Sequence, residues 1–114
     1  MSRLREVTSR EFDVNVLQGG RPTVVDFYAP WCGPCRMLAP LLEEIAGRYG
    51  DRVQFVKVNI DEAPDLANRY RVSGVPTLVL FFGGNEVVRV VGLPPQAVLD
   101  QKIGGLAQLA PSTS

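Results

Sequence analysis

Patterns typical of strands and of helices alternate along this chain, and the alternation limits its fold more than any other feature. Four stretches rich in apolar, β-branched and aromatic residues predict strands: residues 23–29, 53–60, 77–82 and 86–91. Helical spacing and helix start signals predict four helices: residues 8–17, 32–49, 61–70 and 94–109. With a short first strand counted at residues 5–7, this order predicts a three-layer α/β/α sandwich around one central mixed sheet.

Single residues predict where several of these elements begin, bend or turn. Thr8 and Glu11 have the spacing of a capping box at the start of the first helix. Asp61 is expected to cap the third helix. Pro40 lies inside the second helix and should kink it, because proline removes a backbone donor. Residues 83–85 (GGN) predict the turn of a hairpin.

The length of the chain suits one domain. A chain of 114 residues can bury roughly two thirds of its unfolded surface, which is enough for one core without further stabilising links. We expect a single domain over residues 1–110. Residues 111–114 are expected to form a flexible C-terminal tail.

Charge and hydropathy argue against several classes of partner. The chain has twelve basic and twelve acidic residues, so it lacks the positive excess that favours nucleic acid or an anionic membrane surface. No apolar run approaches the ~20 residues of a membrane-spanning helix. Residues 1–8 (MSRLREVT) lack the apolar stretch of a signal peptide. We expect a cytoplasmic monomer with no nucleic-acid or membrane partner.

Cys32 and Cys35 are the only cysteines, and they lie where a predicted strand gives way to a helix. Free backbone N–H groups and the positive dipole end of the helix favour a thiolate there, and a lowered thiol pKa makes a cysteine nucleophilic near neutral pH. Cys35 returns to nearly the same helix face, which places the two Cα atoms about 5–6 Å apart, within reach of a disulfide. This placement of C-x-x-C is typical of a redox-active dithiol.

A structural zinc site is the alternative interpretation of the two cysteines. Zinc in such sites takes four ligands, and this chain has no histidine and no third cysteine. Four thiolates would require a symmetric dimer. The redox interpretation is therefore favoured, and we expect no metal.

Several motifs together resemble the thioredoxin family over residues 8–109, nearly the whole chain. They are Trp31-Cys32-Gly33-Pro34-Cys35, Asp26 in the strand before them, Lys57 in the next strand, Gly74-Val75-Pro76-Thr77, and Gly92. The chain departs from the usual family pattern at Tyr28, where tryptophan is common, and at residues 93–95 (LPP). The resemblance implies the thioredoxin fold and a protein-disulfide oxidoreductase.

The resemblance assigns catalytic roles to four residues. It implies that Cys32 attacks a target disulfide and that Cys35 then displaces the target and closes the Cys32–Cys35 disulfide. The helix position agrees, since Cys35 lies one turn further in and should be more buried than Cys32. It also implies that Asp26 helps to deprotonate Cys35. Burial should raise the pKa of Asp26; the alternative is a buried ion pair between Asp26 and Lys57 without a catalytic role.

The resemblance also implies a docking surface for substrate proteins. The Val75-Pro76 peptide bond should be cis and face the dithiol; an ordinary trans proline at the start of a strand is the alternative. The Val75 backbone could then pair with an extended substrate segment. Gly92 would let that segment approach closely, or be only a turn glycine. We expect an apolar surface made of six residues: Trp31, Gly33, Pro34, Val75, Pro76 and Gly92.

Three functions are weighed for such a chain. A protein-disulfide reductase that works through mixed disulfides is favoured by the Gly33-Pro34 pair and by the missing export signal. An oxidant or isomerase of the same fold is the second, and a binding module with an idle dithiol is the third. For the reductase we expect no bound cofactor besides the Cys32–Cys35 disulfide. Its partners would be disulfide-containing proteins and a thioredoxin reductase, either an NADPH-dependent flavoprotein or a ferredoxin-linked enzyme.

Overall fold

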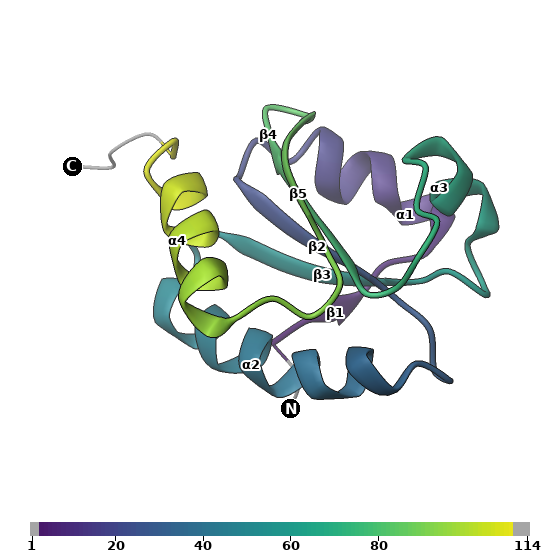
Figure 1. The fold of residues 1–114 in the computed structure, drawn as a ribbon. Helices are drawn as coiled ribbons and strands as arrows, with labels where there is room; N and C mark the ends of the chain where they lie inside the picture. Colours follow the sequence, from purple (N-terminus) through teal and green to yellow (C-terminus); the bar gives the residue numbers. More distant parts are fainter. Residues whose placement is uncertain (1–2, 111–114) are drawn as a thin grey trace.

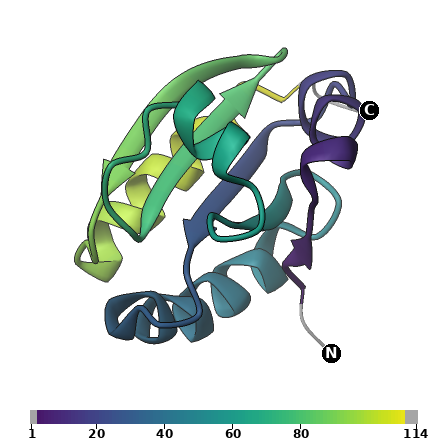
Figure 2. The ribbon, with the colours of Figure 1, turned by 90° about the vertical axis from the view of Figure 1, so that its right-hand side faces the viewer.

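A computed structural model describes residues 3–110, in which five strands form one mixed sheet. The strands are β1 (Arg5–Glu6), β2 (Thr23–Tyr28), β3 (Gln54–Asn59), β4 (Thr77–Phe82) and β5 (Asn85–Val91). Their order across the sheet is β1-β3-β2-β4-β5. β1, β3 and β2 are parallel, whereas β4 and β5 run antiparallel to their neighbours. Figure 2 shows β5 at one edge of the sheet and β1 at the other.

Helices cover both faces of this sheet (Figure 1). The helical segments are α1 (Ser9–Phe12), a π-type segment η1 (Asp13–Leu17), α2 (Gly33–Tyr49), α3 (Pro64–Arg69) and α4 (Gln96–Ala107). One core cluster joins the sheet to α2 and α4, and a second joins it to α1, η1 and α3. The predicted three-layer α/β/α architecture is confirmed.

The central strand β2 sends alternate side chains into the two clusters. Val24 packs in the α2–α4 cluster and Val25 in the other. Asp26 is therefore on the same face as Val24, under α2, because successive side chains of a strand point to opposite faces. Asp26 pairs in register with Lys57 on β3 and with Leu78 on β4. An acidic side chain is thus built into the middle of the sheet.

Local signals predicted some helix ends and missed others. The capping box is present, since the Thr8 hydroxyl accepts from the Glu11 N–H and the Glu11 carboxylate accepts from the Thr8 N–H. Asp61 was wrongly expected to cap α3, which begins at Pro64 after an uncapped Ala63. Proline suits the first helical turn because its missing donor is not needed there. The expected tail, residues 111–114, lies outside the described residues.

Candidate active site

The dithiol lies where β2 passes into α2, as the sequence predicts. Cys32 is the N-cap of α2, and its Sγ accepts a hydrogen bond from the Cys35 N–H at 3.2 Å. The two cysteines form a disulfide with their Cα atoms 5.3 Å apart. The Cys35 N–H therefore lies at the helix start and points at the Cys32 sulfur. A hydrogen bond and a helix N-terminus both favour the charged form.

The two cysteines are equally buried in this oxidised form, which corrects the expected contrast between them. Each residue is 4% exposed. The Cys32 Sγ is covered because it is bonded to Cys35 and lies 3.6 Å from the Val75 carbonyl oxygen. Its helix position alone therefore does not expose it. The two cysteines still differ in one hydrogen bond: the Cys32 sulfur accepts from a backbone N–H at the helix start, and no such bond to the Cys35 sulfur is found within residues 3–110.

Asp26 is a buried carboxyl group beneath the dithiol. The residue is 3% exposed, and its Oδ1 has no hydrogen-bond partner among the described residues. Burial raises the pKa of Asp26 from 3.8 to about 7, while the nearby positive charge of Lys57 acts in the opposite direction. The predicted rise is confirmed. A carboxyl group with a pKa near neutrality can both accept and release a proton at physiological pH.

Lys57 lies near Asp26 without forming the ion pair that was the alternative interpretation. Its Nζ lies over the Tyr28 ring, 5.6 Å from the ring centroid. The Tyr28 hydroxyl donates a hydrogen bond to Glu6 on β1. Tyr28 and Glu6 were not predicted as part of the site, because their contact joins strands β1 and β2, which are not adjacent in the sheet.

A cavity of about 160 Å³ connects the carboxyl group with the dithiol. Asp26, Lys57, Tyr28 and Cys35 all contribute to its wall. Its wall is largely apolar but includes the charged side chains of Asp26, Arg36, Glu43 and Lys57, and its volume has room for water that these groups could bind. It therefore offers a path by which a proton could pass between Cys35 and Asp26.

The segment between α3 and β4 brings Val75 against the dithiol. The Val75–Pro76 peptide bond is cis, as the resemblance implies. The Gly92 N–H donates to the Pro76 carbonyl at 2.8 Å, so the end of β5 lies beside this segment. Within residues 3–110, no hydrogen bond joins the Val75 N–H to an acceptor. That N–H can therefore donate to a new partner.

The remaining predicted surface residues surround the dithiol, with one exception. Trp31 is 66% exposed, and Gly33 and Pro34 are exposed beside it. Pro76 is buried, so it can contribute through its backbone rather than its ring. The Trp31 Nε1 donates to the Asp61 carboxylate at 3.1 Å. Asp61, predicted as a helix cap, instead holds the indole.

Two further features bear on the kind of site. In the described part of the chain, no three His, Cys, Asp or Glu side chains gather as metal ligands would. None of the helices within residues 3–110 is both long and apolar enough to cross a membrane.

Comparison with known proteins decides the family. The family model described as Thioredoxin matches residues 3–104. The chain belongs to the thioredoxin family. It is 47% identical to Thioredoxin 1 of Nostoc sp. over 103 residues, 90% of this chain and 96% of that protein. It is 48% identical to Thioredoxin 1 of Synechococcus elongatus over 99 residues, 87% of this chain and 92% of that protein.

One relative carries a thioredoxin and a thioredoxin reductase in a single chain. The chain is 44% identical over 94 residues to the bifunctional thioredoxin reductase/thioredoxin of Mycobacterium leprae, which covers 82% of this chain and 20% of that protein. Family membership and the Cys32–Cys35 pair make this chain a dithiol protein-disulfide reductase. As in other thioredoxins, disulfide-containing proteins are its targets and a thioredoxin reductase returns it to the dithiol.

Proposed function

We propose that Cys32 is the attacking thiol and Cys35 the resolving thiol. The Cys32 thiolate attacks one sulfur of a target disulfide, and the other target sulfur leaves as a thiolate. The Cys35 thiol then loses its proton and attacks the Cys32 sulfur, which releases the second target thiolate and closes the Cys32–Cys35 disulfide. Two electrons pass to the target. The observation that carries this assignment is the hydrogen bond from the Cys35 N–H to the Cys32 Sγ.

We propose that Asp26 takes the proton from Cys35 during the second step. Its pKa of about 7 and the cavity it shares with Cys35 support this role. Lys57 would tune Asp26, since its positive charge lowers the pKa of that carboxyl group. Neither residue touches the dithiol through a direct hydrogen bond, so water in the cavity would carry the proton.

We propose that substrate segments dock on six residues around the dithiol. A segment whose sulfur meets Cys32 passes Val75, because the Val75 carbonyl oxygen lies 3.6 Å from the Cys32 Sγ. The unpaired Val75 N–H supports pairing with the backbone of an extended substrate. Apolar contacts would come from the surface around it: Trp31, Gly33, Pro34, Pro76 and Gly92.

We infer that residues 1–110 act as one monomeric domain in the cytoplasm, where they carry electrons from an NADPH-dependent flavoprotein to disulfides. A closely spaced cysteine pair that cycles between dithiol and disulfide is typical of redox proteins in reducing compartments, which supports the cytoplasm. No bound cofactor is needed, since the dithiol itself holds the two electrons.

A Cys35→Ser variant tests the assignment of the two thiols. Without a resolving thiol, it should accumulate mixed disulfides through Cys32, which a non-reducing gel and mass spectrometry detect. Cys32→Ser is the matched control and should trap at least ten times less. Equal trapping by the two variants would contradict the assignment. Recovery of non-covalent partners only would favour the binding-module function.

A further inference from the structure

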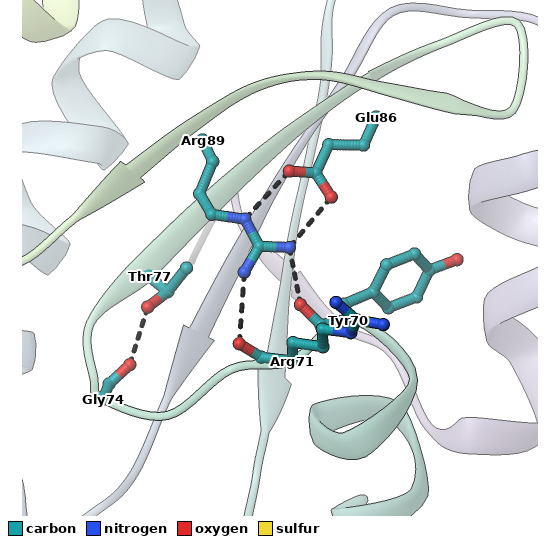
Figure 3. A network of polar contacts seen from close by, with 6 residues as sticks. All are labelled: Tyr70, Arg71, Gly74, Thr77, Glu86 and Arg89. Carbon is teal, nitrogen blue, oxygen red and sulfur yellow. Dashed lines mark hydrogen bonds and ion pairs between the residues drawn. The ribbon is translucent and has the colours of Figure 1, made fainter.

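A partly exposed network of polar contacts centres on Arg89 of β5 and reaches the segment that carries Val75 (Figure 3). Its Nη2 donates to the Tyr70 carbonyl at 2.5 Å and its Nη1 to the Arg71 carbonyl at 3.3 Å. The same guanidinium forms two bonds to the Glu86 carboxylate, at 2.8 and 2.9 Å. Only 28% of the Arg89 side chain is exposed. One side chain thus joins β5 to a segment 18 residues away in the chain.

The two carbonyls that Arg89 binds lie at the start of the segment that carries Val75. Tyr70 is the C-cap of α3, and Arg71 turns the chain with a φ of 54°, which non-glycine residues rarely adopt. Tyr70 is also fixed underneath, where its ring packs edge-on against Phe81 with centroids 5.3 Å apart. The chain then needs only four residues to reach Val75. The Arg71 turn therefore lies close enough to influence the position of Val75, together with the bond from the Val72 N–H to the Ala67 carbonyl at 2.8 Å.

The other end of the segment is held by separate contacts. The Thr77 hydroxyl donates to the Gly74 carbonyl at 2.6 Å (Figure 3). The Gly92 N–H donates to the Pro76 carbonyl at 2.8 Å. These bonds tie the segment to β4 and to the end of β5. Residues 70–76 thus form a bridge that Arg89 holds at its start and these two bonds hold at its end.

We propose that Arg89 is a positioning residue for substrate docking. It holds the start of this bridge, residues 70–76, so that Val75 presents its backbone beside Cys32. This inference rests on the proposed docking role of Val75. Arg89 does not touch the dithiol, so it sets how well a protein segment docks and leaves the chemistry of Cys32 unchanged.

The chemistry of the network requires an arginine oriented by an acid. A guanidinium offers five donors in a fixed plane, so it can bind two carbonyls and a carboxylate at once, whereas a lysine ammonium cannot match that planar arrangement. The Glu86 carboxylate fixes the plane of the guanidinium and balances its charge. Glu86 is three residues before Arg89 on the same strand, and a β-bulge between Leu80 and Phe81 of the partner strand interrupts the register nearby.

The test compares a protein disulfide with a small one. Fully reduced Arg89→Ala protein is mixed with insulin or with 5,5′-dithiobis(2-nitrobenzoate), and second-order rate constants are measured from acid-quenched samples. We expect the insulin rate constant to fall about three- to ten-fold, the range that one or two lost network contacts produce. The rate with the small disulfide, which needs no backbone pairing, should stay within two-fold. The pH profile of Cys32 alkylation by iodoacetamide should not move.

Three further variants make the result decisive. Arg48→Ala is the matched control, since Arg48 is also paired with an acid, Asp100, but this pair joins α2 to α4. It should change neither the insulin rate constant nor the rate constant with the small disulfide. Glu86→Gln keeps the bonds to the carbonyls and should lower the insulin rate less than Arg89→Ala does. It also carries the test if Arg89→Ala fails to fold. Trp31→Ala removes a proposed docking contact directly and should lower the insulin rate.

The outcomes separate the two proposals. The positioning role would be overturned if Arg89→Ala lowered the rate constants with insulin and with the small disulfide equally. It would also be overturned if both Arg89→Ala and Glu86→Gln left the insulin rate constant unchanged. If Trp31→Ala still lowers the insulin rate in that case, the docking proposal stands without Arg89. If Trp31→Ala and Arg89→Ala both leave the insulin rate unchanged, the docking surface itself is wrong.

Discussion

Replacing Asp26 with alanine should stabilise the fold at high pH and not at low pH. The folded-state pKa of about 7 lies above the ordinary value of 3.8, so the folded protein holds this proton more tightly than the unfolded chain. The stability that this gives is fully present below about pH 4 and is lost as the pH rises through about 7. The shift from 3.8 to about 7 corresponds to about 4 kcal/mol lost at pH 8 and above.

The size of the net effect follows from two opposing changes. Removing the carboxyl group from a site that is 3% exposed leaves a small void, which costs about 1 kcal/mol at every pH. Asp26→Ala should therefore be about 1 kcal/mol less stable than the parent at pH 4. It should be about 3 kcal/mol more stable at pH 8.5. The sign of the effect should reverse between pH 4 and 7.

Urea unfolding of the oxidised proteins, followed by circular dichroism from pH 4 to pH 9, measures this reversal. Oxidised protein is used because its cysteines do not titrate. Asp51→Ala is the control, since it removes an acid that is exposed rather than buried. An Asp26→Ala difference that does not change with pH, or a clear loss of stability at pH 8.5, would refute the account of Asp26.

Three other substitutions test separate parts of the structure. Lys57→Met removes the charge that lowers the pKa of Asp26, so a carboxyl titration followed by NMR should show that pKa above the parent's; an unchanged value would contradict the coupling. Gly84→Ala should destabilise more than Gly83→Ala in urea, because both have positive φ but only at Gly84 would the new Cβ lie 2.9 Å from a backbone oxygen; equal losses would count against this. Thr8→Ala should cost about 1 kcal/mol through loss of the capping box, and a loss under a few tenths would mean that the box adds little.

The fold was predictable because its signals are local. Apolar runs identify the strands, and the cysteine pair at a strand-to-helix boundary identifies the reactive site from the sequence alone. Asp26 was also predictable, since a carboxyl group in an apolar strand has few interpretations. These features depend on residues close together in the sequence.

Contacts between distant segments could not be predicted in the same way. Asp61 looked like a helix cap, and only the folded chain shows it bonded to Trp31, 30 residues away. Arg89 looked like one polar residue in a β-strand, and its bonds to Tyr70 and Arg71 depend on how α3 meets β5. The burial of Cys32 likewise depends on Val75, which lies 43 residues further along the chain.

The reduction potential of the Cys32–Cys35 couple tests the central claim most directly. Equilibration with glutathione or dithiothreitol buffers at pH 7, with the dithiol fraction measured by alkylation and mass spectrometry, gives this value. A protein-disulfide reductase of this family should give a reduction potential of about −270 mV. Such a couple is more reducing than the glutathione couple at a poise of about −220 to −260 mV. A value of about −180 mV or higher, typical of isomerases and oxidants, would contradict the account.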